Sequence, residues 1–256
     1  LSHAFHQLLQ SGSHRDLRSC DLLCRIALQL GADLVNFTEL IVAENPNPRA
    51  PIVCGLDEPE RFQRLHLEAS NLSRRHQLAE ERPPLYGVPV GIKDIFHVDG
   101  FQTRAGSQLP ERALRGRQAT AVSQLKEAGA LILGKTVTTE FAYFAPGQTR
   151  NPHNLERTPG GSSSGSAAAV AAGLAPLALG TQTIGSVIRP ASFNGVIGFK
   201  PSYGAISTEG LIPLAPSLDY VGIFAQDLDL AQIAAEVLCT NWDAEMPSEG
   251  KAITAN

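Results

Sequence analysis

Hydrophobic and polar positions along the chain follow two patterns. Apolar residues at helical spacing predict helices over 58–81, 117–128 and 166–172, and one further helix that Asp227 caps. Short apolar runs predict strands over 86–96, 130–134, 174–179 and 196–200. This alternation of helices and strands favours an α/β fold, with a mixed and mostly parallel sheet covered by helices.

The amino-terminal segment predicts one more helix, which begins at Ser13 and ends at Gly31. Two of the four cysteines, Cys20 and Cys24, lie on its apolar face with Leu17 and Ala27. Their spacing could hold half of a metal site, but no second pair completes it, so we interpret both cysteines as core residues. Four cysteines are too few for a disulfide scaffold.

The composition is that of a globular protein, with 43% hydrophobic and 18% charged residues. A net charge of −4 gives no electrostatic reason to expect nucleic acid or an anionic membrane as a direct partner. No apolar run approaches the roughly 20 residues that a spanning helix needs. We therefore expect a cytoplasmic protein.

Two glycine-rich loops carry the candidate chemistry. The first covers 160–166 and leads into an alanine-rich helix, and the second places Ser186 between Gly185 and Val187. Glycine lets backbone N–H groups turn inward and approach a ligand closely. Two such loops suit a serine-based site with a pocket that stabilises an anion.

A serine hydroxyl needs a base within hydrogen-bond reach. The run 161–165 (G-S-S-S-G) also matches the nucleophile elbow of α/β-hydrolases, which requires a histidine downstream of the serine. All seven histidines precede both loops, the last being His153, so that interpretation fails. No Lys-Ser or Lys-Thr follows Gly165, which argues against a phosphate-binding loop.

Lysine becomes the candidate base. Lys93 lies within an apolar strand, where burial would disfavour the charged form and lower the pKa. Lys135 and Lys200 also lie in apolar strands, and Lys93 could instead pair with Asp94, so sequence context alone leaves these options open.

The run from Thr158 to Pro201 closely resembles the signature motif of the amidase signature family, which reads G-G-S-S-x-G-S and then G-T-x-x-G-G-S with a nearby Arg and Pro. The resemblance includes Y-G-V-P-V-G-I-K-D over 86–94 and S-L-D-Y-V-G over 217–222, and covers roughly residues 16–239. It implies an amidase signature domain over 1–239. The polar tail over 240–256 is a candidate truncation point, because members of the family continue further.

The resemblance also implies roles for individual residues. Ser186 corresponds to the acylated nucleophile, Lys93 to the base, and Ser162 to the serine that bridges them. The peptide bond between Gly161 and Ser162 is expected to be cis. The implied oxyanion hole consists of the backbone N–H groups of Thr183, Ile184, Gly185 and Ser186. For Ser163, Ser164 and Ser166 we expect a helix-capping role.

Two departures from the family pattern concern the second loop. Gln182 stands where the pattern often has an acid, and Arg189 lies one place later than the usual Arg, with Ile188 in its place. Acid and base have thus left their usual places together, as an abandoned ion pair would require. Ile184 replaces a glycine, and its β-branched side chain is expected to narrow the acyl pocket.

These observations predict an amidase that hydrolyses a carboxamide C–N bond through an acyl-enzyme on Ser186, with no metal or organic cofactor. The expected partner is a small-molecule amide, and a homodimer is a candidate assembly. One alternative is the glutaminase component of a tRNA-dependent amidotransferase, which uses the same triad. Another is a non-catalytic fragment.

Overall fold

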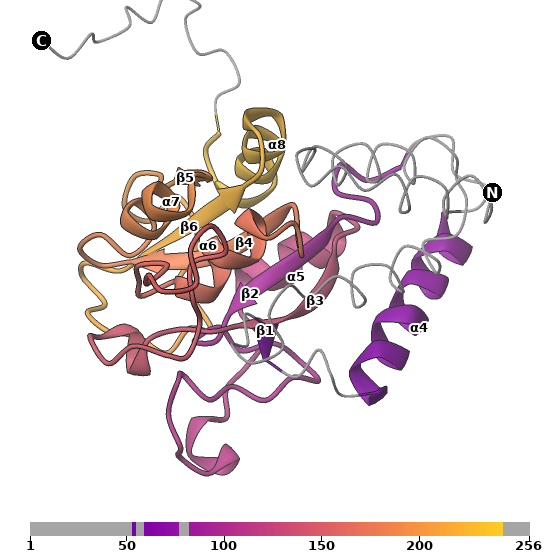
Figure 1. Cartoon of the computed structure of the whole chain (residues 1–256). Coiled ribbons are helices and arrows are strands. Elements are labelled where there is room, and N and C mark those ends of the chain that lie inside the picture. Colours follow the sequence, from indigo (N-terminus) through magenta and orange to yellow (C-terminus); the bar gives the residue numbers. More distant parts are fainter. Residues whose placement is uncertain (1–52, 55–58, 77–81, 243–256) are drawn as a thin grey trace, which may run out of the picture.

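A six-stranded mixed sheet forms the centre of the computed structural model, which describes residues 53–54, 59–76 and 82–242 (Figure 1). The strand order is β1-β3-β2-β4-β6-β5. The strands are β1 (Val53–Cys54), β2 (Pro89–Lys93), β3 (Leu131–Thr136), β4 (Leu177–Gln182), β5 (Ile197–Phe199) and β6 (Tyr220–Ala225). The helices are α4 (Pro59–Arg75), α5 (Thr120–Glu127), α6 (Ser164–Ala171), α7 (Ile188–Asn194) and α8 (Leu228–Leu238), with short 3-10 turns at Glu111–Leu114 and Glu140–Ala142.

Parallel pairing is confined to the three central strands. β2 pairs in parallel with β3 on one side and with β4 on the other, whereas β1, β6 and β5 pair antiparallel to their neighbours. The carboxyl ends of β2, β3 and β4 therefore meet at one edge of the sheet, the edge at which α/β folds bind ligands. Lys93 is the last residue of β2 and lies opposite Thr136 of β3.

Helices cover both faces of the sheet (Figure 1). On one face, α5 and α8 pack on the alternating residues Val90, Ile92, Leu179 and Ile223. On the other, the small side chains of α6 and α7 pack closely against Ala178 and Phe224. This division follows from strand geometry, because successive side chains point to opposite faces.

The predicted fold class is confirmed, and so are most of the predicted elements. The helix expected over 58–81 is α4, that over 117–128 is the shorter α5, and Asp227 caps α8 by accepting a hydrogen bond from the N–H of Leu230 at 2.8 Å. The predicted strands correspond to β2, β3, β4 and β5. The helix expected from Ser13 to Gly31, with Cys20 and Cys24, lies outside the described residues.

Three elements were not predicted from the pattern of apolar residues, the first being the two-residue strand β1. β6 was noted only as part of the run 217–222, and α7 is a seven-residue helix with a proline in its first turn. Helix α7 ends at Gly195, which has a φ of 65° and so adopts the left-handed conformation that glycine tolerates best. Such short elements contain too few residues to reveal a period.

Candidate active site

The side chain of Lys93 is enclosed at the carboxyl edge of the central strands. It is 0% exposed, and its Nζ lies 2.8 Å from Ser162 Oγ and 2.8 Å from Thr181 Oγ1. The carbonyl oxygen of Thr181 is the third polar neighbour, at 3.5 Å. These polar atoms around the amine are all neutral, and the nearest are two hydroxyl groups.

Burial lowers the pKa of Lys93 well below the ordinary lysine value, while the charge of Asp219 opposes this by favouring the protonated amine. A neutral amine has a lone pair that can accept a proton. With Ser162 Oγ at hydrogen-bond distance, the geometry allows the lysine to accept a proton from that serine.

The loop before α6 presents Ser162 to this lysine. The peptide bond between Gly161 and Ser162 is cis, as the resemblance implied. Gly160 has a φ of 78°, which strains any other residue, and a Cβ atom there would lie in tight contact with the backbone of Pro190, at 3.1 Å. Ser162 is 2% exposed, and its carbonyl accepts a hydrogen bond from the N–H of Thr139.

The capping role expected for the other serines is wrong. Ser163, at the N-cap position of α6, makes no capping hydrogen bond, and its hydroxyl instead donates to the carbonyl of Thr181 at 3.1 Å. Ser164 Oγ donates to the carbonyl of Val137, and Ser166 Oγ donates to that of Leu179. These hydroxyls tie α6 to the neighbouring strands, because buried carbonyl groups of β4 and of the segment after β3 compete for them.

Ser186 lies on the turn between β4 and α7 and is half-buried. In the described part of the chain, it makes no hydrogen bond with Ser162. Lys93 and Ser162 are thus in contact, whereas Ser186 is placed only on the adjacent turn. Hydrogen bonds between catalytic groups are often long in structures without substrate.

The same turn presents a row of backbone donors. Within the described residues, none of the N–H groups of Thr183, Ile184, Gly185 and Ser186 donates a hydrogen bond. The side chain of Gln182 closes this turn, because its Oε1 accepts hydrogen bonds from the N–H groups of Val187 and Ile188, at 2.9 and 3.0 Å. Four successive free N–H groups can bind a developing anion.

The two departures from the family pattern now have structural explanations. Gln182 orders the turn, as just described, and Arg189 donates to the carbonyl of Gly161 from Nε and Nη2. Each therefore has its own partner. The side chain of Ile184 is 86% exposed on this turn and packs against little within the described residues, so its expected narrowing of the acyl pocket stays a prediction.

The structure separates the three candidate lysines. Lys135 forms a buried ion pair with Asp94 at 2.7 Å and a hydrogen bond with Thr103. Lys200 lies over the ring of Tyr220, 3.7 Å from its centroid, and donates to the carbonyl of Pro201. Asp94 is therefore the partner of Lys135 and not of Lys93, and Lys93 is the lysine that contacts the hydroxyl of Ser162.

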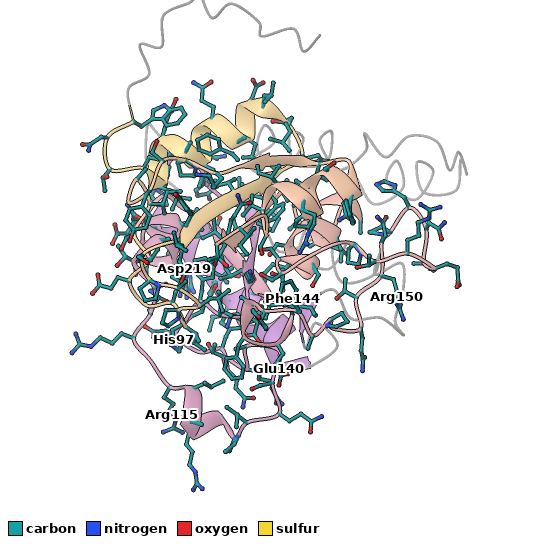
Figure 2. The ribbon with its side chains drawn as sticks, turned by 90° about the vertical axis from the view of Figure 1, so that its left-hand side faces the viewer. His97, Arg115, Glu140, Phe144, Arg150 and Asp219 are labelled. Atoms are coloured by element: carbon teal, nitrogen blue, oxygen red, sulfur yellow. The ribbon has the colours of Figure 1, made fainter. Side chains whose placement is uncertain are left out.

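Two residues of the site were missed from the sequence. Thr181 holds the amine of Lys93, and Asp219 lies where β6 begins (Figure 2). Asp219 is part of the run 217–222 that carries the resemblance, and the presence of an acid within that run was the available signal.

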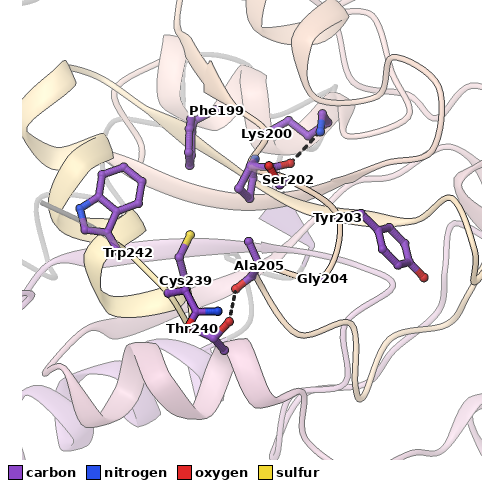
Figure 3. Close-up of a pocket in the computed structure, with 11 residues that line it drawn as sticks. Phe199, Lys200, Ser202, Tyr203, Gly204, Ala205, Cys239, Thr240 and Trp242 are labelled. Carbon is purple, nitrogen blue, oxygen red and sulfur yellow. Dashed lines mark hydrogen bonds between the residues drawn. The ribbon is translucent and has the colours of Figure 1, made fainter. Parts of the chain in front are cut away.

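A cavity of about 590 Å³ lies elsewhere, between the segment after β5 and the end of α8 (Figure 3). Phe199, Lys200, Tyr203, Cys239 and Trp242 are among the residues that line it. Neither Lys93, Ser162 nor Ser186 does, so this cavity is separate from the site described above.

A sequence model of the amidase family matches residues 60–254. The chain belongs to the amidase signature family. Among curated relatives, a glutamyl-tRNA(Gln) amidotransferase subunit of Koribacter versatilis is 46% identical over 177 residues, which are 67% of this chain and 37% of that protein. The protein of the same name from Acidothermus cellulolyticus is 38% identical over 247 residues, which are 89% of this chain and 48% of that protein.

Solved structures of the family share the fold. The native peptide amidase from Stenotrophomonas maltophilia matches with a TM-score of 0.74 and 32% identity, over 92% of this chain and 51% of that enzyme. This member of the amidase signature family thus spans about half, or less, of the length of the relatives that it matches. None of the described helices is long and apolar enough to span a membrane.

Proposed function

We propose that this protein hydrolyses carboxamide C–N bonds, with Ser186 as nucleophile, Ser162 as proton relay and Lys93 as base. The observation that carries the proposal is the enclosed amine of Lys93, 2.8 Å from the hydroxyl of Ser162. A buried lysine with a lowered pKa and a serine neighbour is typical of a catalytic base rather than of a structural cation.

In the first step, the oxygen of Ser186 attacks the amide carbonyl. Its proton passes to Ser162, and Ser162 passes its own proton to the neutral amine of Lys93. The carbonyl oxygen becomes an oxyanion that faces the N–H groups of residues 183–186. Losing one donor of this kind typically lowers the rate by a factor of about 100 to 1000.

In the second step, the tetrahedral species collapses. The C–N bond breaks, and the leaving nitrogen takes a proton from the Lys93 ammonium through Ser162, which leaves an acyl-enzyme on Ser186. Water then attacks this ester and gives up a proton by the same relay. The bond between the acyl carbon and the serine oxygen breaks, releasing a carboxylic acid and restoring all three groups.

A second candidate function shares this chemistry. The curated relatives described above are amidotransferase subunits, which favours glutamine as the amide and transfer of the released ammonia within a complex. Ammonia release from glutamine, compared with release from simple primary amides and measured with and without the other amidotransferase subunits, distinguishes the two functions. Turnover of simple amides by the protein alone favours an independent amidase.

The nucleophile is tested by labelling the purified protein with a fluorophosphonate probe and mapping the adduct by mass spectrometry. We expect the label on Ser186, its loss in Ser186→Ala and its retention in Ser163→Ala. An adduct on Ser163 in the parent protein would contradict the assignment and revive a nucleophile elbow in the first loop.

A further inference from the structure

The antiparallel ladder of β4 and β6 brings Asp219 beside the turn that carries Ser186. The last pair of the ladder joins Gln182 to Tyr220, and the next residues outward are Thr183 and Asp219. Thr183 Oγ1 donates to Asp219 Oδ1 at 2.5 Å. The acid therefore contacts Thr183, the first residue of the row of free N–H groups.

The carboxylate of Asp219 is buried and bound only by neutral donors. Its Oδ2 accepts hydrogen bonds from the N–H groups of Leu214 and Ala215, both at 2.9 Å, and the residue is 7% exposed. No cation forms an ion pair with it in the described part of the chain. Because no positive charge neutralises the carboxylate of Asp219 at close range, its electric field extends to other groups through the low-dielectric interior.

Lys93 is the group on which this charge acts. Burial lowers the pKa of Lys93 and Asp219 opposes that effect. Other charged groups near the site already have partners: Lys135 and Asp94 pair with each other, and Arg189 binds the carbonyl of Gly161. Lys135 lies opposite Ile92 in the sheet, and Lys93 is the next residue along β2. The side chains of the two lysines therefore project from opposite faces of the sheet.

We propose that Asp219 is a positioning residue with two separable roles, holding the Thr183 turn in place and setting, through its charge, the pH at which Lys93 becomes a base. The inference rests on the proposed function of Lys93. A carboxylate that raises the pKa of Lys93 is chemically useful, because a lysine that becomes too weakly basic accepts a proton poorly. A distant carboxylate offsets part of the desolvation without forming an ion pair that would occupy the amine.

Two substitutions separate the roles. Asp219→Asn removes the charge but can keep the contacts, since the amide oxygen can accept from Leu214 and Ala215 while the amide nitrogen donates to Thr183 Oγ1. Thr183→Val removes the hydroxyl that binds the acid and keeps the charge. Asp227→Asn is the matched control, because Asp227 also accepts a backbone hydrogen bond but lies at the start of α8.

The readout for the charge is the titration of Lys93 itself, followed by NMR of protein with isotope-labelled lysine. The chain contains only five lysines, and Lys93→Met assigns the signal by its loss. We expect Lys93 to titrate at lower pH in Asp219→Asn than in the parent, and at the parent's pH in Thr183→Val and in Asp227→Asn. An unchanged titration in a folded Asp219→Asn protein would overturn the electrostatic role.

The readout for the turn is turnover. Thr183→Val should lower kcat roughly tenfold with little change in KM, because small displacements of catalytic donors reduce rates strongly. Parent-like kcat in this variant would overturn the positioning role. If the NMR shift occurs but no form of the protein hydrolyses an amide, the charge coupling stands and the proposed function fails.

Discussion

The guanidinium of Arg189 donates two hydrogen bonds to the carbonyl oxygen of Gly161, at 3.1 Å from Nε and 2.6 Å from Nη2. Arg189 belongs to α7, which follows the turn of Ser186, and Gly161 directly precedes Ser162. This contact joins the two serine loops across the sheet edge. It depends on the fork of two donors that only arginine provides.

Arg189→Lys should therefore impair the site although it keeps the charge. A lysine provides a single point of contact, so the two loops would lose their fixed separation, and we expect kcat to fall roughly 10- to 100-fold. The measurement is steady-state hydrolysis of a small amide. Arg117→Lys, at an exposed position after the 3-10 turn, is the control that should behave like the parent. Parent-like kcat in Arg189→Lys would show that the contact does not position the serines.

Lys93→Met should remove the base while filling a similar volume. Because only the neutral amine accepts a proton and burial lowers its pKa, parent activity should rise as pH increases through that lowered value. The variant should lose this acidic limb and a factor of roughly 100 to 10,000 in kcat/KM. Lys200→Met should keep the parent's profile, and near-normal turnover in Lys93→Met would require a different base.

Lys135→Met should damage stability rather than the pH profile. The substitution leaves the buried carboxylate of Asp94 without its cation, which typically costs about 3–5 kcal/mol of unfolding free energy. Urea denaturation measures the loss. The double variant Lys135→Met/Asp94→Leu should recover part of it, because the unpaired charge is gone. A single variant as stable as the parent would mean that the pair contributes nothing.

The unfolding free energy should rise with pH because of Lys93. In the unfolded chain the lysine has its ordinary pKa of about 10.5, and in the folded chain the pKa is lower. Between these two values the unfolded state binds more protons, so raising the pH through that window favours the folded state. Urea denaturation of parent and Lys93→Met at several pH values from 7 to about 10 tests this. The variant should show the weaker increase, and identical slopes would contradict a lowered pKa.

Local pattern was sufficient to predict α5, α6 and α8 of the helices that cover the sheet, and the strands β2, β3 and β4 that end at the site, since all of these follow from runs and spacing of apolar residues. It could not choose among Lys93, Lys135 and Lys200, because all three lie within or directly after apolar runs that predict strands. The choice depends on which face each side chain takes and on which hydroxyl or acid lies there. Strand register determines these neighbours, and the spacing of apolar residues does not reveal it. Lys93 was therefore chosen as the base from the family resemblance.

The misassigned serines illustrate the same limit. A hydroxyl at a helix start predicts a cap, yet Ser163 and Ser166 bind strand carbonyls that are distant in the sequence. Asp219 was missed for a related reason, since its partner Thr183 is 36 residues away and meets it only through the β4–β6 ladder. Contacts between strands decide the chemistry here, and spacing along the chain does not encode them.

The close seating of α6 has a consequence for protein engineering. Its residues from Ser164 to Val170 are all buried, and a Cβ atom on the strand glycine Gly180 would lie 2.7 Å from Ser163 Oγ. Libraries that randomise this helix would mostly yield unfolded chains. Diversity aimed at a new acyl group belongs on the exposed positions Ile184 and Ile188, which lie on the nucleophile turn or directly after it and can accept new side chains without repacking the interior.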